Sequence, residues 1–275
     1  MMNIIPLFDP LDCRLDPYRD MKREDVRRRG EWFIAEGKLV VQRLLASDYK
    51  TVSILAEPKR VDWVRSLVKP ETPILVVSAE LIQEVVGFNF HRGLLACGRR
   101  IAFESSQRLM DVTDPRQIAL AAVAVNDLEN LGSLIRTAAA LGIDRVILNR
   151  QSVDPLCRRV LRVSMGAALK MRFYDWESPA QWLQENERNR VWFSIATTLS
   201  DDSIPMGQVT GHPDFASRPK LIVMGNEGDG LPASIQAACT TRAQIPMALG
   251  IDSLNVSVAG AIAIYELIRD RGERT

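Results

Sequence analysis

The first hundred residues alternate between short apolar runs and stretches whose apolar residues recur at helical spacing. The runs TVSILAE, PILVVS and GLLACGR predict three buried strands, at 51–57, 73–78 and 93–99. Apolar residues three or four positions apart predict helices within 33–45, 60–68 and 79–86. This alternation of strands and helices predicts a small α/β sandwich.

The rest of the chain carries strand-like apolar runs, of which IALAAVAV at 118–125 contains no polar residue. The clearest of them fall at 118–125, 145–149, 191–198 and 221–224. Uninterrupted runs are typical of parallel strands that are covered on both faces. The run at 221–224 and a second strand-like run beginning at Ile245 each break into a polar loop that contains glycine. Because open α/β sheets bind ligands at the carboxyl ends of their strands, these two loops predict a small-molecule pocket.

Changes in composition divide the chain into four segments. Residues 1–30, rich in proline, aspartate and arginine, are predicted to be an N-terminal arm. Residues 31–105 contain the small α/β sandwich. Periodicity is lost in residues 106–117, which we interpret as a linker. Residues 118–275 are predicted to form a larger α/β domain with a parallel sheet.

Composition narrows the class of protein without choosing a function. The 275 residues are 47% hydrophobic and 25% charged, which is normal for a globular protein. A net charge of +1 gives no global basic bias, so a nucleic-acid partner would need a local patch. Four scattered cysteines without a CxxC pair, and only two histidines, argue against a metal site. No apolar run approaches the ~20 residues of a membrane span, and we expect a cytoplasmic protein that does not bind membranes.

Three loops follow predicted strands and share a composition of glycine with asparagine or a carboxylate. They hold Asn130, Gly132 and Arg136; then Gly225, Asn226, Glu227, Gly228 and Gly230; then Gly250, Asp252, Ser253 and Asn255. Glycine allows a backbone to approach a ligand closely. The second loop reads G-x-x-G-x-G late in the chain, so it is not the dinucleotide-binding fingerprint, and no phosphate-binding G-x-x-x-x-G-K-[ST] motif is present.

The three loops, in this order, resemble the motifs of the SpoU branch of the SPOUT superfamily of RNA 2′-O-ribose methyltransferases. The matching stretches are NLGSLIRTA, MGNEGDGL and IPMALGIDSLNVSVA, and the resemblance covers 118 to about 269. DPLCRRVLRVSMGAA looks like the segment that links the first two motifs. HRGLLA, at 91–96, is similar to the closing strand of an α/β RNA-binding domain that often precedes this catalytic domain.

The resemblance implies a fold, a cofactor and partners. The C-terminal domain is expected to be a SPOUT α/β-knot, a parallel sheet with a trefoil knot, and the protein a homodimer. S-adenosyl-L-methionine is expected as the methyl donor and tRNA or large-subunit rRNA as the substrate. The expected cofactor-binding residues are Gly225, Asn226, Gly230, Ile245, Met247 and Leu254. The expected catalytic and substrate-binding residues are Arg136, Asn130, Glu227, Ser253 and Asn255. No metal is expected.

Arg136 carries the main chemical question in this assignment. The family gives it the role of activating the ribose hydroxyl, yet an arginine with a pKa above ~12 normally stays protonated. We therefore favour a guanidinium that stabilises the developing alkoxide and binds a phosphate. A role as a base would need a strongly perturbed arginine. Without the motif, Arg136 would be interpreted as an ordinary residue on a helix surface.

The other assignments also have structural alternatives. Asn130, Ser253 and Asn255 could cap helices, and Glu227 could be a solvated loop carboxylate. Residues 1–30 could be a solvated arm or an extension that contacts RNA. The small and apolar residues of the last helix are interpreted as core, although they would also suit a dimer contact; they are Val256, Ala259, Gly260, Ala263, Ile264 and Leu267.

Three other functions compete with an RNA 2′-O-methyltransferase. The first is a non-catalytic RNA-binding protein that retains the fold, which would predict degraded loops; Asn130, Arg136, Glu227 and Asn255 are all present. The second is a nucleotide-dependent oxidoreductase, against which the misplaced glycine pattern argues. The third is a base methyltransferase of the wider superfamily, and the stretch SLNVSVA favours the ribose branch.

Overall fold

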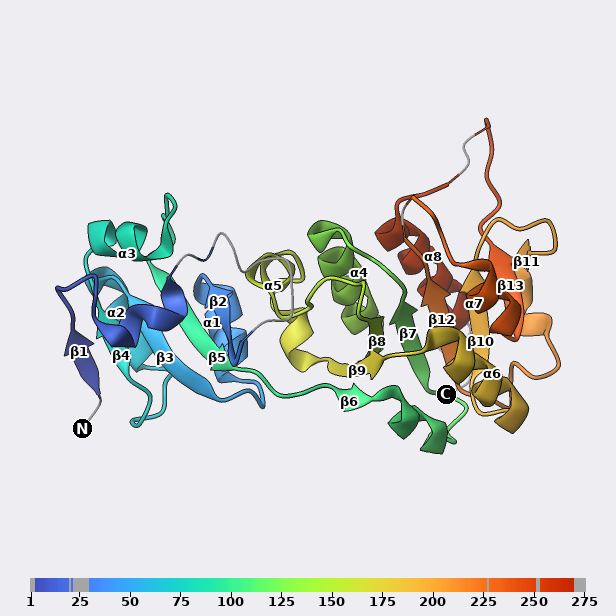
Figure 1. The fold of residues 1–275 in the computed structure, drawn as a ribbon, viewed down its shortest axis with the longest axis horizontal. Coiled ribbons are helices and arrows are strands. Elements are labelled where there is room, and N and C mark those ends of the chain that lie inside the picture. The colour runs from blue at the N-terminus through green and yellow to red at the C-terminus, as the bar shows by residue number, and fades with distance from the viewer. Residues whose placement is uncertain (1–2, 20, 22–29, 227, 251–252, 270–275) are drawn as a thin grey trace. The chain divides into compact units, whose positions relative to one another are not determined.

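The computed structural model describes residues 3–19, 21, 30–226, 228–250 and 253–269. The chain divides into two compact units (Figure 1). The first comprises residues 1–102 and 154–170, and the second comprises 103–153 and 171–275. Among the described residues, no helix combines the length and the apolar character that a membrane crossing needs.

The first unit is built on a five-stranded mixed sheet. Its strands, in the order β1-β4-β3-β5-β2, are Ile4–Pro6, Ile74–Val76, Thr51–Ala56, Leu94–Arg99 and Trp32–Glu36. The β1-β4-β3 pairs are parallel, and β5 pairs antiparallel with both β3 and β2. Its α-helices are α1 (Lys38–Leu45), α2 (Val61–Arg65), α3 (Ala79–Val86) and α5 (Arg158–Val163). The predicted α/β sandwich is present, but the helix expected within 33–45 begins only at Lys38, since the preceding residues form β2.

Part of the N-terminal arm belongs to the core of the first unit. The 3-10 helix η1 (Cys13–Tyr18) buries Leu15 and Tyr18 completely, and the Tyr18 hydroxyl lies 2.8 Å from the Ser53 hydroxyl. A solvated arm is therefore wrong for this stretch. The buried helix could not be predicted from the sequence because a short 3-10 helix containing proline shows no helical periodicity. The basic run 27–29 lies outside the described residues.

Residues 154–170 pack with the first unit, although the sequence placed them in the larger domain. Arg158 donates to Glu36 Oε2 at 2.6 Å, and Arg92 and Arg162 also contact this carboxylate. Asp154 is buried and ion-paired with Arg100. Arg158 and Arg162 of α5 therefore pair with Glu36 of β2, and such pairing offsets the cost of burying a carboxylate.

The second unit contains an eight-stranded sheet in which every strand pair is parallel. In the order β11-β13-β10-β12-β7-β8-β9-β6, the strands are Ile204–Pro205, Thr241–Gln244, Phe193–Thr197, Lys220–Met224, Ile118–Ala122, Arg145–Asn149, Arg172–Trp176 and Glu104–Ser105. The α-helices are α4 (Leu128–Ala140), α6 (Pro179–Asn189), α7 (Ala233–Ala238) and α8 (Val256–Ile268). The predicted parallel α/β sheet is thus observed.

Three segments of this unit differ from the sequence prediction. No strand begins at Ile245; β13 ends at Gln244, one residue before it, and its half-buried position near the sheet edge requires no apolar run. The linker 106–117 begins with the 3-10 helix η3 (Ser106–Asp111), which buries Leu109. The long excursion 200–220 contains β11 and the 3-10 helix η5 (Met206–Gly211), which buries Met206 and Val209.

Helices α4 and α8 pack directly against each other (Figure 1). A Cβ built on Gly260 of α8 would lie 2.3 Å from Leu134 Cδ1 of α4, so glycine permits this close approach. Gly260, Ala263, Ile264 and Leu267 are buried. The interpretation of this stripe as core is confirmed, and the helix that approaches its small residues is α4 of the same chain.

Candidate cofactor and substrate site

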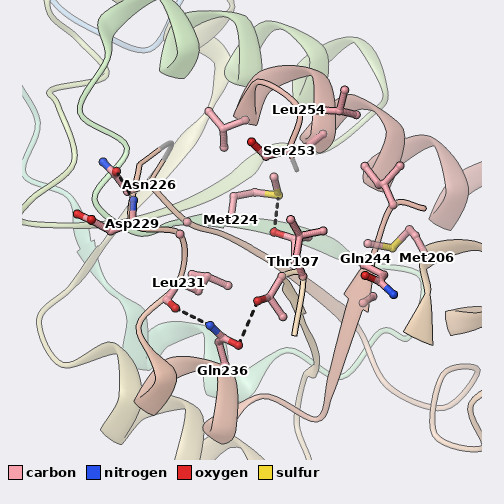
Figure 2. Close-up of a pocket in the computed structure, with 18 of the residues that line it drawn as sticks. Thr197, Met206, Met224, Asn226, Asp229, Leu231, Gln236, Gln244, Ser253 and Leu254 are labelled. Atoms are coloured by element: carbon pink, nitrogen blue, oxygen red, sulfur yellow. Dashed lines mark hydrogen bonds between the residues drawn. The ribbon is translucent and has the colours of Figure 1, made fainter. Parts of the chain in front are cut away.

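A cavity of about 400 Å³ lies where the adjacent strands β13, β10 and β12 end (Figure 2). Because these strands are parallel, the loops that follow them leave from the same edge of the sheet. The start of α8 and part of η5 complete the wall. The cavity has the size of a typical small-molecule site and mixes apolar side chains with a few polar groups.

All six residues predicted to bind the cofactor line this cavity. They are Gly225, Asn226, Gly230, Ile245, Met247 and Leu254. Ser253, predicted as a catalytic or substrate-binding residue, lines it as well. The structure therefore brings together the second and third loops of the sequence motifs, and their individual roles stay predictions.

The second loop closes on itself immediately after β12. Asn226 and Gly230 exchange two backbone hydrogen bonds, of 3.3 and 3.0 Å. Gly225 is buried, and a Cβ built there would lie 2.5 Å from the Gly230 carbonyl carbon and 2.6 Å from the Leu231 nitrogen. The loop can close in this way only because residue 225 has no side chain.

The first and third motifs also meet. Asn255 Nδ2 donates to Asn130 Oδ1 at 2.7 Å, which links α4 to the start of α8. Asn255 is the N-cap of α8, and its side-chain oxygen accepts from the Ser257 amide at 2.9 Å. Asn130 is not the cap of α4, because Asp127 holds that position and accepts from two amides of the first turn. Asn255 thus combines a capping role with a contact to the first motif.

Arg136 lies on α4 with an exposed side chain and does not line the cavity. Within the described part of the chain, it makes no hydrogen bond or ion pair. A guanidinium in this position can bind an external anion without first breaking an internal contact. Glu227 lies outside the described residues.

Sequence reasoning missed several residues of the cavity wall. Thr197 ends β10 and Thr198 follows it, Met206 comes from η5, and Gln236 comes from α7. Gln236 joins two walls, because its amide donates to the Leu231 carbonyl at 2.6 Å and accepts from the Thr198 hydroxyl at 3.1 Å (Figure 2). Paired threonines at the end of an apolar strand were the available signal. Met206 and Gln236 lie outside the three motifs, and nothing in the sequence indicated that they line the cavity.

No metal cluster accompanies this cavity in the described residues: no three His, Cys, Asp or Glu side chains gather closely enough to hold an ion. Among the described residues, the cavity wall is instead built from backbone groups, amides, hydroxyls and apolar side chains, with Asp229 as the charged member. Such a wall suits an organic ligand that is recognised by shape and hydrogen bonds.

The fold and the cavity define an α/β protein that binds a small organic molecule at the ends of parallel strands. A model of the SpoU rRNA Methylase family matches residues 117–265. An uncharacterized tRNA/rRNA methyltransferase of Mycobacterium tuberculosis (strain ATCC 25618 / H37Rv) is 34% identical, covering 98% of this chain and 93% of the relative. The 23S rRNA (guanosine-2′-O-)-methyltransferase RlmB of Acinetobacter baylyi is 30% identical, covering 78% and 86%. The chain belongs to the SpoU rRNA methylase family.

The fold is shared with a solved rRNA methyltransferase. The AdoMet-bound rRNA methyltransferase from Sinorhizobium meliloti superposes with a TM-score of 0.80 at 24% identity, covering 97% of this chain and 98% of that one. The family predicted from the three motifs is thereby confirmed, as is the class of enzyme, an S-adenosylmethionine-dependent RNA methyltransferase.

Proposed function

We propose that this protein transfers the methyl group of S-adenosylmethionine to the 2′-hydroxyl of a ribose in rRNA or tRNA. The observation that supports this most directly is the single cavity wall formed by all six expected cofactor residues. The named activity of the Acinetobacter relative, a guanosine 2′-O-methyltransferase of 23S rRNA, supports the ribose as the acceptor.

The residues of the cavity fit this cofactor. A closed glycine loop at Gly225 and Gly230 offers backbone groups at close range, and Ile245, Met247 and Leu254 offer an apolar wall. The cofactor supplies a methyl group already activated by its sulfonium. What remains for the chain is to orient the ribose hydroxyl in line with that methyl group and to stabilise the hydroxyl as it loses its proton.

Arg136 is the residue we assign to this stabilisation. As a protonated guanidinium it would lower the energy of the developing alkoxide and bind a neighbouring phosphate of the RNA. Its exposure and lack of internal partners among the described residues support a role toward a bound substrate. Asn130 and Asn255, joined by their hydrogen bond, would fix the start of α4 relative to the third loop. Ser253 and Glu227 remain predicted substrate-binding residues.

We also propose that the enzyme is a homodimer in which α8 contacts a second copy. This helix is apolar on nearly all of its faces, and such a helix is normally buried on every side. Val258 and Tyr265 lie two turns apart on α8 and are 47% and 58% exposed. A second copy covering them would bury this face through a two-fold contact. Sedimentation of Val258→Glu, expected to shift the protein toward a monomer, tests this contact.

A trefoil knot is the finer topology that we propose for the second unit. The chain leaves β13, near one edge of the sheet, and α8 then packs against α4 and β12 farther into it. The closed second loop lies beside this return path.

We further propose that residues 31–105 bind the RNA substrate and select the site of modification. The cytoplasmic location stays a prediction.

The proposed chemistry is tested with RNA transcribed in vitro and labelled S-adenosylmethionine. Comparing 2′-O-methyl sites in RNA from cells with and without this gene first identifies the target. A substrate with 2′-deoxyribose at that nucleotide should then accept no methyl group. Methylation that persists on the deoxy substrate would indicate a base as the acceptor. A chain that binds RNA but not S-adenosylmethionine in calorimetry would instead be a non-catalytic RNA-binding protein.

A further inference from the structure

Ala124, just after β7, adopts a left-handed backbone conformation with φ of 54°. This conformation is unfavourable for a residue with a Cβ and persists only where the surroundings hold it. Both main-chain polar groups of Ala124 are held by asparagine side chains. Its amide donates to Asn149 Oδ1 at 2.9 Å, and its carbonyl accepts from Asn226 Nδ2 at 2.8 Å. Ala124 therefore connects a side chain at the end of β8 with one in the loop after β12.

Asn149 forms the buried side of this connection. It is the last residue of β8 and is 7% exposed. Its Oδ1 also accepts from the Ser152 amide at 3.2 Å and lies 2.9 Å from the Ser152 hydroxyl. That hydroxyl accepts from the Val125 amide at 3.2 Å. Asn149 and Ser152 thus hold two successive amides of the turn that follows β7, and the buried position makes each of these hydrogen bonds costly to lose.

Asn226 forms the side that faces the cavity (Figure 2). Its Oδ1 accepts from the Gly228 and Asp229 amides at 2.7 and 3.2 Å, so its side chain folds the second loop. The amide group can satisfy those two donors only while its Nδ2 points the other way, toward the Ala124 carbonyl. The position of Ala124 therefore determines how the second loop is oriented.

We infer that Asn149 is a positioning residue for the cofactor loop, acting through Ala124 on Asn226. This inference rests on the proposed function, in which the second loop binds S-adenosylmethionine. Asn149 does not line the cavity, and the sequence motifs do not include it. Its effect is to preorganise the loop backbone before the ligand arrives, which lowers the cost of binding.

The test is calorimetry of S-adenosylmethionine binding to the full chain and its variants. Asn149→Ala leaves the Ala124 amide without its acceptor and should raise the Kd roughly tenfold, as expected for loss of one buried hydrogen bond. Asn149→Asp retains an acceptor at the same place and should bind within about threefold of wild type. Ser152→Ala removes the hydroxyl that accepts from the Val125 amide and lies within hydrogen-bond distance of Asn149 Oδ1 and the Ala122 carbonyl, but it leaves the Ala124 amide its acceptor, so it should have a smaller effect in the same direction. If Asn149→Ala fails to fold, tighter or unchanged binding by Ser152→Ala overturns the inference.

A double-mutant cycle tests the route of the effect. Asn226→Asp keeps the oxygen that folds the loop but loses the donor to Ala124. Once this link is absent, adding Asn149→Ala should weaken binding by much less than it does in the wild-type background. Multiplicative effects of the two substitutions would show that Asn149 does not act through Asn226, and would overturn the inference.

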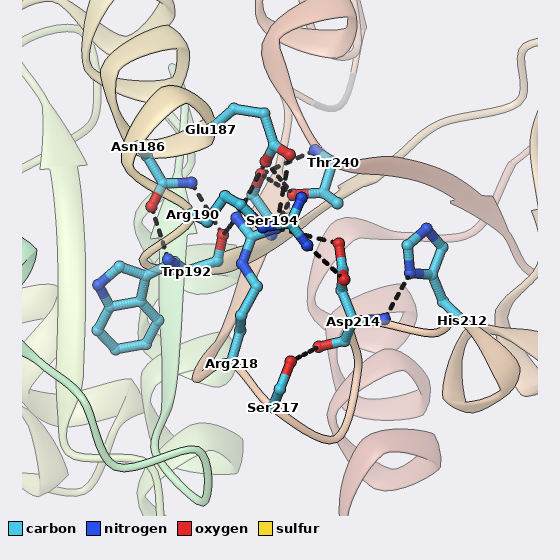
Figure 3. A network of polar contacts seen from close by, with 10 residues as sticks. All are labelled: Asn186, Glu187, Arg190, Trp192, Ser194, His212, Asp214, Ser217, Arg218 and Thr240. Atoms are coloured by element: carbon cyan, nitrogen blue, oxygen red, sulfur yellow. Dashed lines mark hydrogen bonds and ion pairs between the residues drawn. The ribbon is translucent and has the colours of Figure 1, made fainter.

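Asn186 provides the matched control (Figure 3). It is another buried asparagine of the same unit, and its side chain makes two hydrogen bonds to the main chain of Trp192, at 2.7 and 2.9 Å. Asn186→Ala should lower the Tm without changing the Kd. An equal rise of the Kd in Asn186→Ala would reduce the effect of Asn149 to a general loss of stability. If the wild-type chain does not bind S-adenosylmethionine, both the proposed cofactor and this inference are overturned. If the wild type binds and Asn149→Ala binds equally well, the inference alone is overturned.

Discussion

Asn255 donates a 2.7 Å hydrogen bond to Asn130, although 125 positions separate them in the chain. One residue begins α8 and the other lies in the first turn of α4. The contact joins the first and third sequence motifs into one site. The sequence allowed both residues to be interpreted as helix caps. In the structure Asn255 is the cap of α8, and Asn130 faces it without being a cap.

Asn255→Ser should separate the capping role of Asn255 from its contact with Asn130. Serine caps helices about as well as asparagine, so the free energy of unfolding should change by less than ~0.5 kcal/mol. Its side chain is too short to reach Asn130, so we expect kcat/KM for RNA methylation to fall by roughly tenfold. Denaturant unfolding and methyl-transfer rates measure the two effects. Asn255→Ala, which also loses the cap, should cost about 1 kcal/mol more, and unchanged methylation by Asn255→Ser would contradict a role for the contact.

Substitutions of Arg136 should change activity without changing stability. The side chain is exposed and unpaired among the described residues, so Arg136→Ala and Arg136→Lys should unfold at the wild-type Tm. Loss of charge stabilisation in Arg136→Ala should lower kcat by about 100-fold or more. Lysine keeps the charge but not the planar fork, so the kcat of Arg136→Lys should lie between that of Arg136→Ala and that of the wild type. Near-full activity of Arg136→Lys would exclude any role that requires the bidentate geometry.

Sequence patterns predicted the central part of the site because its strands are buried on both faces. β7 and β12 appear as uninterrupted apolar runs, and their carboxyl ends place the glycine loops. Strands nearer the sheet edges, such as β9 and β13, mix polar with apolar residues and gave no comparable signal. The position of a loop after a buried strand is thus readable from the sequence, whereas the full set of strands is not.

The contacts that support the site could not be predicted from the chain alone. Ala124 carries no sign of a left-handed conformation, since alanine is not a residue that favours it. Asn149 ends a strand that looks ordinary in the sequence, and Gln236 lies on a short helix with no motif. Each of these roles depends on residues brought together by the tertiary fold.

Gly225→Ala should weaken S-adenosylmethionine binding strongly, because a Cβ would lie 2.5 Å from a main-chain atom of the closed second loop. Backbone cannot move aside as a flexible side chain can, so the loop would have to open, and we expect the Kd to rise on the order of 100-fold. Gly228→Ala is the matched control in the same loop. A Cβ there would approach Asn226 Oδ1 no closer than 3.4 Å, so binding should stay near that of wild type. Calorimetry distinguishes the two, and equal affinities would contradict a tightly closed loop.

The ion pair between Glu187 and Arg218 should make part of the stability depend on pH (Figure 3). Arg218 is buried and donates to Glu187 Oε2 at 3.0 Å, and the Thr240 hydroxyl donates to the same oxygen at 2.7 Å. Burial alone would raise the pKa of Glu187, but these two hydrogen bonds, together with the positive charges of Arg218 and Arg190, outweigh it and the pKa is lowered from 4.5. A lowered carboxyl pKa stabilises the fold above pH 4.5, and this contribution is lost as the pH falls through the folded-state value.

Glu187→Gln should therefore unfold at a lower Tm than wild type at pH 7, with the difference shrinking below pH 4.5. Because Glu187 is partly exposed, solvent screening limits the loss to about 1 kcal/mol, equivalent to roughly 2–4 °C. Glu185→Gln removes an exposed carboxylate from the same helix and controls for the change in net charge. Thermal unfolding of the three proteins between pH 3.5 and 7 measures the effect. A constant difference between Glu187→Gln and wild type across this range would show that the carboxylate charge contributes nothing, and that the side chain stabilises α6 only through its neutral hydrogen bonds.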